Sequence, residues 1–229
     1  MLQEAVAARA AELRQSRFHR GNRRILAERV RSIKEGRARV LEIGCGHLDF
    51  TLDYLRSACG ELVATDLEQL FPVDTQLPPG VSFQLADALD LPFDEGSFDC
   101  VIALEVIEHV TDADRFVSEA LRVLRPGGKF IFTTPNRLRL TALARYPIGR
   151  PIRFPHTYAV DPVLGEIRHL REFSHRDLRQ LVREHEAQIA AVQIEGVALG
   201  VPAWQLVVLR PGPLHRLAFN WHVVLTRAP

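Results

Sequence analysis

The stretch that decides the fold is VLEIGCG at residues 40–46, a short apolar run that ends in two closely spaced glycines. Such a run is typical of a buried strand, and the glycines after it indicate a tight turn into a helix. In a doubly wound α/β sheet, this first turn lies at the crevice where ligands bind. Glycine suits that place because a ligand can approach its backbone without meeting a Cβ atom.

Further apolar runs of strand length follow at regular intervals along the chain. They lie at residues 62–66, 81–85, 98–104, 129–133, 188–194 and 220–226. Between two of them, residues 112–124 place apolar side chains on one helical face, and the Arg125-Pro126-Gly127-Gly128 turn ends that helix. Strands that alternate with helices favour a parallel sheet covered on both faces. The sequence therefore predicts a doubly wound, Rossmann-like α/β fold with a seven-stranded sheet.

Two segments depart from this pattern of strands and helices, one at the N-terminus and one after the fifth predicted strand. Residues 1–36 have helical periodicity and predict an N-terminal helical arm, which leaves residues 37–229 as the main domain. Residues 135–173 contain five prolines, so they predict a lid insertion after the fifth strand rather than a long helix. A capping box at Ser174-His175-Arg176-Asp177 then predicts the start of another helix.

Charge is strongly segregated along the chain, although the net charge is only +1. Residues 1–39 carry +7, residues 40–119 carry −15, and residues 120–229 carry +9. Five arginines and no acid lie between Arg137 and Val160. These basic segments are either solvated surface, or they overhang the active site and attract an anionic substrate. The sequence leaves both interpretations open.

Composition excludes several classes of protein. The N-terminal residues lack the apolar core and cleavage site of a signal peptide, and the longest apolar stretch outside the strand pattern, 197–209, is too short to span a bilayer. The three cysteines share no metal-binding or redox spacing. We therefore expect a cytoplasmic protein without a transmembrane segment.

Acidic residues stand at the carboxyl ends of successive predicted strands. Asp66 closes the second, Asp87 follows the third and Glu105 follows the fourth, while Glu42 lies within the first. The dinucleotide-binding fingerprint needs a third glycine where this chain has Asp49, which argues against a pyrophosphate ligand. An acidic crevice instead favours a cationic ligand.

A family resemblance extends over residues 38–136, with the expected spacing between motifs. The motifs are VLEIGCG (40–46), TD (65–66), ADALDLPF (86–93), FDCV (98–101), EVIEHV (105–110), LRVLRPGG (121–128) and TPN (134–136). They resemble those of class I S-adenosylmethionine-dependent methyltransferases, and above all the branch with ubiquinone-biosynthesis, sugar and polyketide O-methyltransferases. The resemblance implies S-adenosylmethionine as cofactor.

The resemblance also implies a role for each matching residue. The Gly44-Cys45-Gly46 turn would pass under the methionine part of the cofactor, with Glu42 reaching its ammonium group. Asp66 would hold the ribose, and Leu67 would pack on the adenine. Asp87 would accept from the adenine amine beside the Ala88 backbone, and Glu105 would lie near the sulfonium.

An acceptor hydroxyl would need a base, and His109 is the first candidate, followed by His169 in the insertion. We expect O-methylation of a small-molecule, sugar or lipid-linked acceptor, which the charge pattern suggests is anionic. One alternative is a metal-assisted RNA 2′-O-methyltransferase, because Glu105, Glu108, His109 and His169 resemble the metal-binding residues of enzymes that modify small RNAs. The other alternative is a non-catalytic protein that binds S-adenosylmethionine. No metal ligand is assigned.

Overall fold

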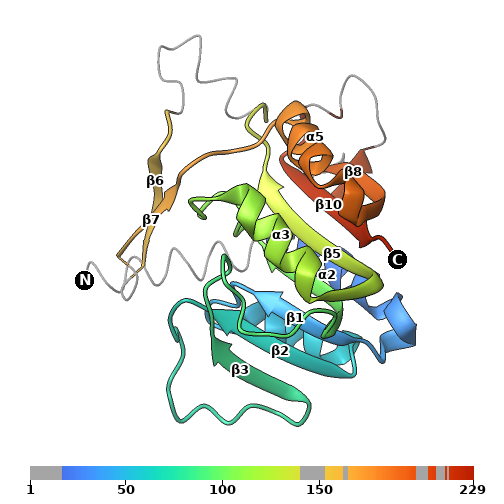
Figure 1. Cartoon of the computed structure of the whole chain (residues 1–229). Coiled ribbons are helices and arrows are strands. Elements are labelled where there is room, and N and C mark those ends of the chain that lie inside the picture. The colour runs from blue at the N-terminus through green and yellow to red at the C-terminus, as the bar shows by residue number, and fades with distance from the viewer. Residues whose placement is uncertain (1–16, 140–152, 162–164, 200–205, 210–214, 216) are drawn as a thin grey trace, which may run out of the picture.

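The computed structural model describes residues 17–139, 153–161, 165–199, 206–209, 215 and 217–229. Eight strands of the described residues form one sheet in the order β3-β2-β1-β4-β5-β10-β8-β9 (Figure 1). They are β1 (Arg39–Ile43), β2 (Glu61–Asp66), β3 (Val81–Leu85), β4 (Phe98–Leu104), β5 (Leu124–Pro135), β8 (Ile189–Leu199), β9 (Leu206–Leu209) and β10 (Asn220–Arg227).

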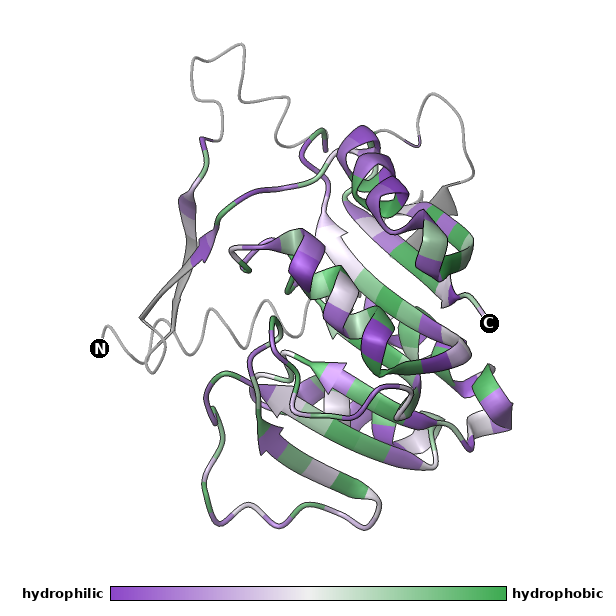
Figure 2. Cartoon of the chain, viewed as in Figure 1, coloured by the Kyte–Doolittle hydropathy of each residue, from purple (hydrophilic) through white to green (hydrophobic). Residues whose placement is uncertain are grey.

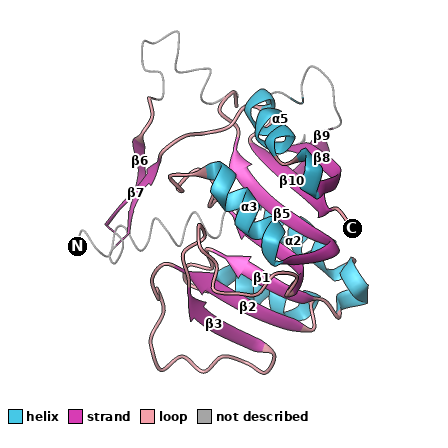
Figure 3. Cartoon of the chain, viewed as in Figure 1, coloured by secondary structure: helices cyan, strands magenta, loops and turns pink. Residues whose placement is uncertain are grey.

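The sheet is parallel from β3 to β5, and β10 then runs antiparallel to both of its neighbours, β5 and β8. The order reverses between β1 and β4, which places the switch point of a doubly wound fold beside the glycine turn. The predicted α/β fold is confirmed. The seven predicted strands are present, and the short edge strand β9 is an addition to them (Figure 3).

Helices cover both faces of the sheet (Figure 1). On one face lie α2 (Arg17–Arg31) and two irregular turns after β1, a π-helical one at Thr51–Leu55 and a 3-10 one at Arg56–Ala58. On the other face lie α3 (Ala113–Val123) and α5 (His175–Glu184). Short 3-10 helices at Ile33–Gly36 and Glu186–Gln188 lead into β1 and β8.

Both predicted helix starts are confirmed by their caps. The Asp112 carboxylate accepts from the Arg115 backbone N–H and begins α3. The Ser174 hydroxyl accepts from the Asp177 N–H, and the Asp177 carboxylate accepts from the Ser174 N–H, which is the predicted capping box. The predicted N-terminal arm is helical from Arg17 to Arg31, and residues 1–16 lie outside the described part.

The core is divided between the two faces of the sheet. Phe98, Phe116, Phe130 and Trp221 are fully buried on the α3 and α5 side, whereas Leu26 of α2 is buried on the other side. In Figure 2 the strands of the main sheet carry much of the hydrophobic colour, and the visible face of α5 is largely hydrophilic. None of the helices within the described residues is long and apolar enough to cross a membrane.

The insertion after β5 contains a two-stranded antiparallel hairpin apart from the main sheet, β6 (His156–Asp161) and β7 (Gly165–His169) (Figure 3). Its end is tied to the loop after β4, because the Leu170 N–H donates to the Glu108 carbonyl at 2.8 Å. Two of the five arginines of this basic segment, Arg145 and Arg150, lie outside the described residues. Closure of the hairpin over the sheet, as a lid, stays a prediction.

Candidate active site

A cavity of about 660 Å³ opens at the carboxyl ends of β1, β2 and β4, at the switch point of the sheet. Its wall contains Gly44 and Gly46 of the first turn, the acids of three strand ends, Arg168 near the end of β7 and Leu170 just after it. The complete lining is Ile43, Gly44, Gly46, His47, Asp66, Leu67, Leu70, Ala86, Asp87, Ala88, Leu89, Glu105, Val106, His109, Val110, Thr111, Arg168 and Leu170.

The glycine turn needs glycine for two different reasons. Gly44 has φ +76°, and a Cβ atom there would lie 2.5 Å from Cγ2 of Val106, so no other residue fits without displacing the loop after β4. Gly46 has φ +55°, and a Cβ there would meet nothing within 4 Å. Gly46 therefore offers its backbone to the cavity. The turn is fixed to β2, because Gly44 N and Cys45 N both donate to the Thr65 carbonyl.

The Asp66 carboxylate is oriented by the backbone around it. Oδ2 accepts from Gly46 N and Oδ1 accepts from Leu67 N, both at 2.8 Å. Each oxygen keeps a second lone pair for a ligand on the cavity side. The Leu67 side chain beside it is 66% exposed, which is unusual for a large apolar residue and leaves it available to an apolar ligand face.

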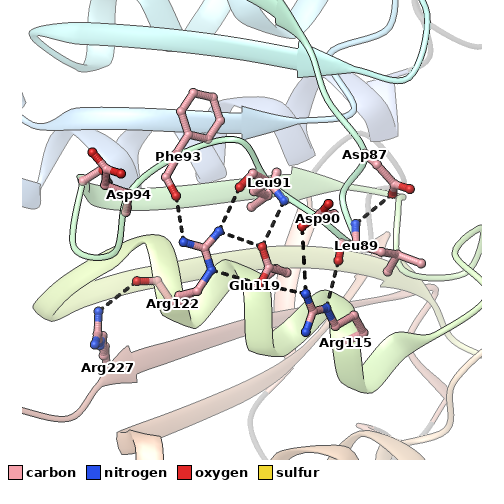
Figure 4. Close-up of polar contacts among 11 residues, drawn as sticks. Asp87, Leu89, Asp90, Leu91, Phe93, Asp94, Arg115, Glu119, Arg122 and Arg227 are labelled. Carbon is pink, nitrogen blue, oxygen red and sulfur yellow. Dashed lines mark hydrogen bonds and ion pairs between the residues drawn. The ribbon is translucent and has the colours of Figure 1, made fainter.

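The loop that carries Asp87 and Ala88 is held by α3 (Figure 4). Glu119 of α3 is buried, and its carboxylate accepts from Leu91 N at 3.0 Å and from Arg122 at 2.7 Å. Arg122 also donates to the Phe93 and Leu91 carbonyls, and Arg115 donates to the Leu89 carbonyl. Hydrogen bonds from Arg122 hold the pKa of Glu119 below its usual value.

We predict that Glu119→Gln loosens this loop without removing any residue from the cavity. Lost charge-assisted bonds should lower the free energy of unfolding by about 1–3 kcal/mol. Cofactor affinity should also weaken, which calorimetric titration measures. Glu61→Gln is the matched control, since Glu61 is exposed, its partner Arg39 is partly exposed, and such surface pairs contribute little. Equal stability and affinity in the two variants would contradict the assigned role of Glu119.

Two carboxylates follow β4. Glu105 is half-buried and lines the cavity, and its Oε1 accepts from the Thr133 hydroxyl at 2.7 Å and the Asn220 amide at 2.8 Å. Its φ of +56° is strained for a residue with a side chain, as found at functional sites. Glu108 is fully buried, and burial together with the neighbouring Glu105 raises its pKa well above its usual value.

The two predicted histidines lie next to each other. The His109 ring lines the cavity, and its Nδ1 lies 2.8 Å from the Arg168 carbonyl. A carbonyl only accepts, so we assign the proton to Nδ1 and the free lone pair to Nε2. Burial lowers the pKa of His109 from its usual 6.5. The buried His169 ring packs edge-on at 4.9 Å, and His169 is not part of the cavity wall.

His169 is in turn held by the insertion and the segment after it. Its Nδ1 lies 3.2 Å from Oε1 of Glu172, and the other carboxylate oxygen of Glu172 forms an ion pair with Arg139. Arg139 is one of the arginines that the sequence offered to a substrate, and in the structure it neutralises a buried carboxylate instead. The Arg139 ion pair and the His169 hydrogen bond both lower the pKa of Glu172.

The structure brings most of the predicted site residues to one cavity wall, with two further exceptions. Glu42 is 2% exposed beneath the glycine turn, where its carboxyl accepts from the Thr51 hydroxyl at 2.5 Å, and burial raises its pKa to about 7. The Cys45 side chain points into a small apolar cluster with Leu48 and Ala64. Neither residue lines the cavity, so direct contact of their side chains with a ligand stays a prediction.

The sequence analysis did not identify the part of the wall supplied by Arg168 and Leu170, at the end of β7 and just after it. No local pattern marks them, because they are held at the cavity by long-range hydrogen bonds, one from the His109 ring to the Arg168 carbonyl and one from Leu170 N to the Glu108 carbonyl. Two other wall residues were also not identified, Val110 at the end of the matched motif and Thr111 directly after it.

Comparison with known proteins agrees with this geometry. The family model described as "Methyltransferase domain" matches residues 41–132, which hold the glycine turn, the three strand-end acids and His109. Residues 41–132 thus match a methyltransferase domain, and the chain is similar to S-adenosylmethionine-dependent methyltransferases. The family's cofactor is S-adenosylmethionine, and the acidic cavity with its glycine floor fits that cationic molecule.

Individual relatives match parts of this chain. A "probable S-adenosylmethionine-dependent methyltransferase" of Mycolicibacterium smegmatis is 36% identical over 43% of the chain and 38% of its own length. The chloroplastic tocopherol O-methyltransferase of Arabidopsis thaliana is 38% identical over 45% of the chain and 32% of its own length. The chain thus spans well under half of these relatives.

Solved structures share the fold over nearly the whole chain. One is the N-methyltransferase NodS of Bradyrhizobium japonicum in complex with S-adenosyl-L-homocysteine, with a TM-score of 0.55 and 17% identity. The alignment covers 95% of this chain and 91% of that protein. At this identity the likeness establishes the fold and not the acceptor.

Proposed function

We propose that the protein transfers the methyl group of S-adenosylmethionine to a hydroxyl of a small-molecule, sugar or lipid-linked acceptor. The observation that carries the proposal is His109, whose Nε2 lone pair lies at the wall of the cavity that also contains the glycine turn and Asp66. An imidazole kept neutral by burial is a suitable base for a hydroxyl at neutral pH. The O-methyltransferase among the relatives supports oxygen as the acceptor atom.

Different residues of the cavity wall would hold different parts of the cofactor. Asp66 would accept from the ribose hydroxyls with the lone pairs that its two backbone donors leave free. Leu67 would pack on the adenine ring, and Asp87, next to Ala88, would accept from the adenine amine. The Gly46 backbone would face the methionine part, and Glu105 would lie beside the sulfonium.

When bound, S-adenosylmethionine supplies a methyl group that is already activated by the sulfonium charge. The chain's own residues therefore have to orient the acceptor, exclude water and remove one proton. Nε2 of His109 would take that proton from the acceptor hydroxyl. His169, held by Glu172, would position the His109 ring by packing against its edge.

The test is transfer of a labelled methyl group from S-adenosylmethionine into fractions of a cell extract, followed by mass spectrometry of the product. We expect one labelled small molecule that carries a new methyl ether or ester. Label in RNA would favour the second candidate below. Binding of the cofactor in calorimetry with no labelled product in any fraction would favour the non-catalytic binding protein.

A second candidate function, metal-assisted methylation of an RNA 2′-hydroxyl, is favoured by one group of side chains. Glu108, His109 and His169 each have a ligand atom within 4.8 Å of the others, and His156, His169 and Glu172 form a second such group. Oε1 of Glu108 is buried and has no hydrogen-bond partner among the described residues. A divalent cation would satisfy that oxygen, bind the acceptor oxygen and lower its pKa.

Chelation separates the two candidates. We predict that exhaustive treatment with EDTA leaves methyl transfer within about twofold of the untreated rate, because in the proposed function His109 alone removes the proton. The rate is measured before chelation, after it, and after Mn²⁺ or Mg²⁺ is added back. A large loss that Mn²⁺ or Mg²⁺ restores would contradict this prediction and favour the RNA 2′-O-methyltransferase.

A further inference from the structure

A second cavity, of about 570 Å³, lies against α5 and has a cationic wall. Arg176, Arg179 and Arg183 line it from one side of the helix, together with His175. Leu138, just beyond β5, and the buried Trp221 of β10 border it with apolar surface. No acidic residue is among the described residues that line this cavity.

The three arginines are spaced three and four residues apart, so they project from one face of α5 and repel one another. All three are exposed, and none forms an ion pair with a described residue. Elsewhere in the described part, arginines of the fold such as Arg29, Arg122 and Arg139 are bound to carboxylates. The hydrophilic outward face of α5 in Figure 2 therefore holds an excess of positive charge beside a hollow.

The hollow lies at the same edge of the sheet as the candidate active site. Trp221 borders the α5 cavity, while its neighbour Asn220 donates from β10 to Glu105 in the wall of the first cavity. Leu138 follows the carboxyl end of β5 closely, and the Phe173 carbonyl accepts from the Trp221 indole N–H at 3.0 Å. The two cavities have no lining residue in common, so one molecule would have to extend along this edge to reach both.

We propose that the α5 cavity binds a phosphate or diphosphate group of the methyl acceptor. Arginine suits this ligand because its planar guanidinium donates two parallel hydrogen bonds to phosphate oxygens. The positive end of the α5 helix dipole, at His175 and Arg176, adds to the attraction. Leu138 and Trp221 would contact an apolar part of the same molecule. This proposal rests on the proposed function, because it names the substrate class of that methyl transfer.

The experiment uses the full chain and inorganic pyrophosphate as the probe. Calorimetric titration compares the wild type with an Arg179→Gln, Arg183→Gln double variant. Arg56→Gln is the matched control, an exposed arginine on the opposite face of the sheet. We expect pyrophosphate to bind the wild type and the control equally and the double variant at least about tenfold more weakly. Binding should weaken with added salt.

A second measurement links the cavity to the acceptor. Pyrophosphate should inhibit methyl transfer in competition with the acceptor and not with S-adenosylmethionine, and the double variant should lose this inhibition. Equal pyrophosphate binding by wild type and double variant would overturn the proposal. It would also be overturned if the wild type bound phosphatidylglycerol vesicles but did not bind pyrophosphate. Failure of all three proteins to bind S-adenosylmethionine would instead count against the proposed function, whatever pyrophosphate does.

Discussion

Replacement of His109 by glutamine is expected to lower kcat for methyl transfer by about 10²- to 10⁴-fold, the usual contribution of a general base. The Nδ1 hydrogen bond to the Arg168 carbonyl leaves Nε2 as the group that takes the proton, and a glutamine amide cannot replace it. Affinity for S-adenosylmethionine should stay within about threefold of wild type, because the cofactor needs no base. Steady-state kinetics and calorimetric titration measure the two quantities separately.

The pH dependence of kcat distinguishes a catalytic base at His109 from a histidine with a structural role. Burial lowers the pKa of His109 below 6.5, so the imidazole is neutral over the whole neutral range. The wild-type kcat should fall as pH drops through the lowered pKa of His109 and should be constant at higher pH, where the imidazole is neutral. The His109→Gln variant should lack this acid limb. An unchanged kcat, or the same acid limb in the variant, would refute the assignment of His109 as base.

The fold was largely predictable because its signals are local. Each of the first five strands contains a short run rich in apolar residues, and β2, β3 and β4 match their predicted ranges within one residue. The ends of α3 and α5 follow from side chains that bond the nearest backbone N–H groups, as Asp112 and Ser174 do. Such bonds depend on a few neighbouring residues, which the sequence displays directly.

The site was predictable only where it lies on strand ends. Gly44, Gly46, Asp66, Asp87 and Glu105 share one cavity because parallel strands bring their carboxyl ends to one edge. Predictions that needed a side-chain direction were less complete. The Glu42 carboxyl bonds to Thr51 beneath the turn. The choice between cavity and core at such a position depends on packing, which strand periodicity does not determine.

The insertion after β5 was the part least predictable from the sequence, because its residues contact others that are distant in the chain. In the sequence, the arginines of the insertion could not be told apart as candidates for binding an anionic substrate. The structure distinguishes Arg139, because its guanidinium neutralises the buried Glu172. The arginines of α5 line a cavity with no acidic residue among its described lining residues, and the charge pattern did not single them out. Which positive charges are available to a ligand is decided by the burial of nearby carboxylates.

Asp66→Ala should have the largest effect on cofactor affinity. The carboxylate has two functions, since it orders the Gly46 and Leu67 N–H groups and offers its remaining lone pairs to the ribose hydroxyls. Loss of two charge-assisted bonds should cost about 3 kcal/mol or more, which raises the dissociation constant at least about a hundredfold. Asp66→Asn should also weaken binding. An amide has one accepting oxygen, and its nitrogen only donates, so it cannot accept from Gly46 N and Leu67 N on separate atoms as the carboxylate does.

Calorimetric titration with S-adenosylmethionine measures these constants, and circular dichroism checks that each variant is folded. Asp74→Ala is the matched control, because Asp74 is an exposed acid in the same loop between β2 and β3 and lies outside the cavity wall. Its affinity should equal that of the wild type. A dissociation constant for Asp66→Ala within about threefold of wild type would mean that the ribose is held elsewhere, because lost charge-assisted bonds cannot leave affinity unchanged.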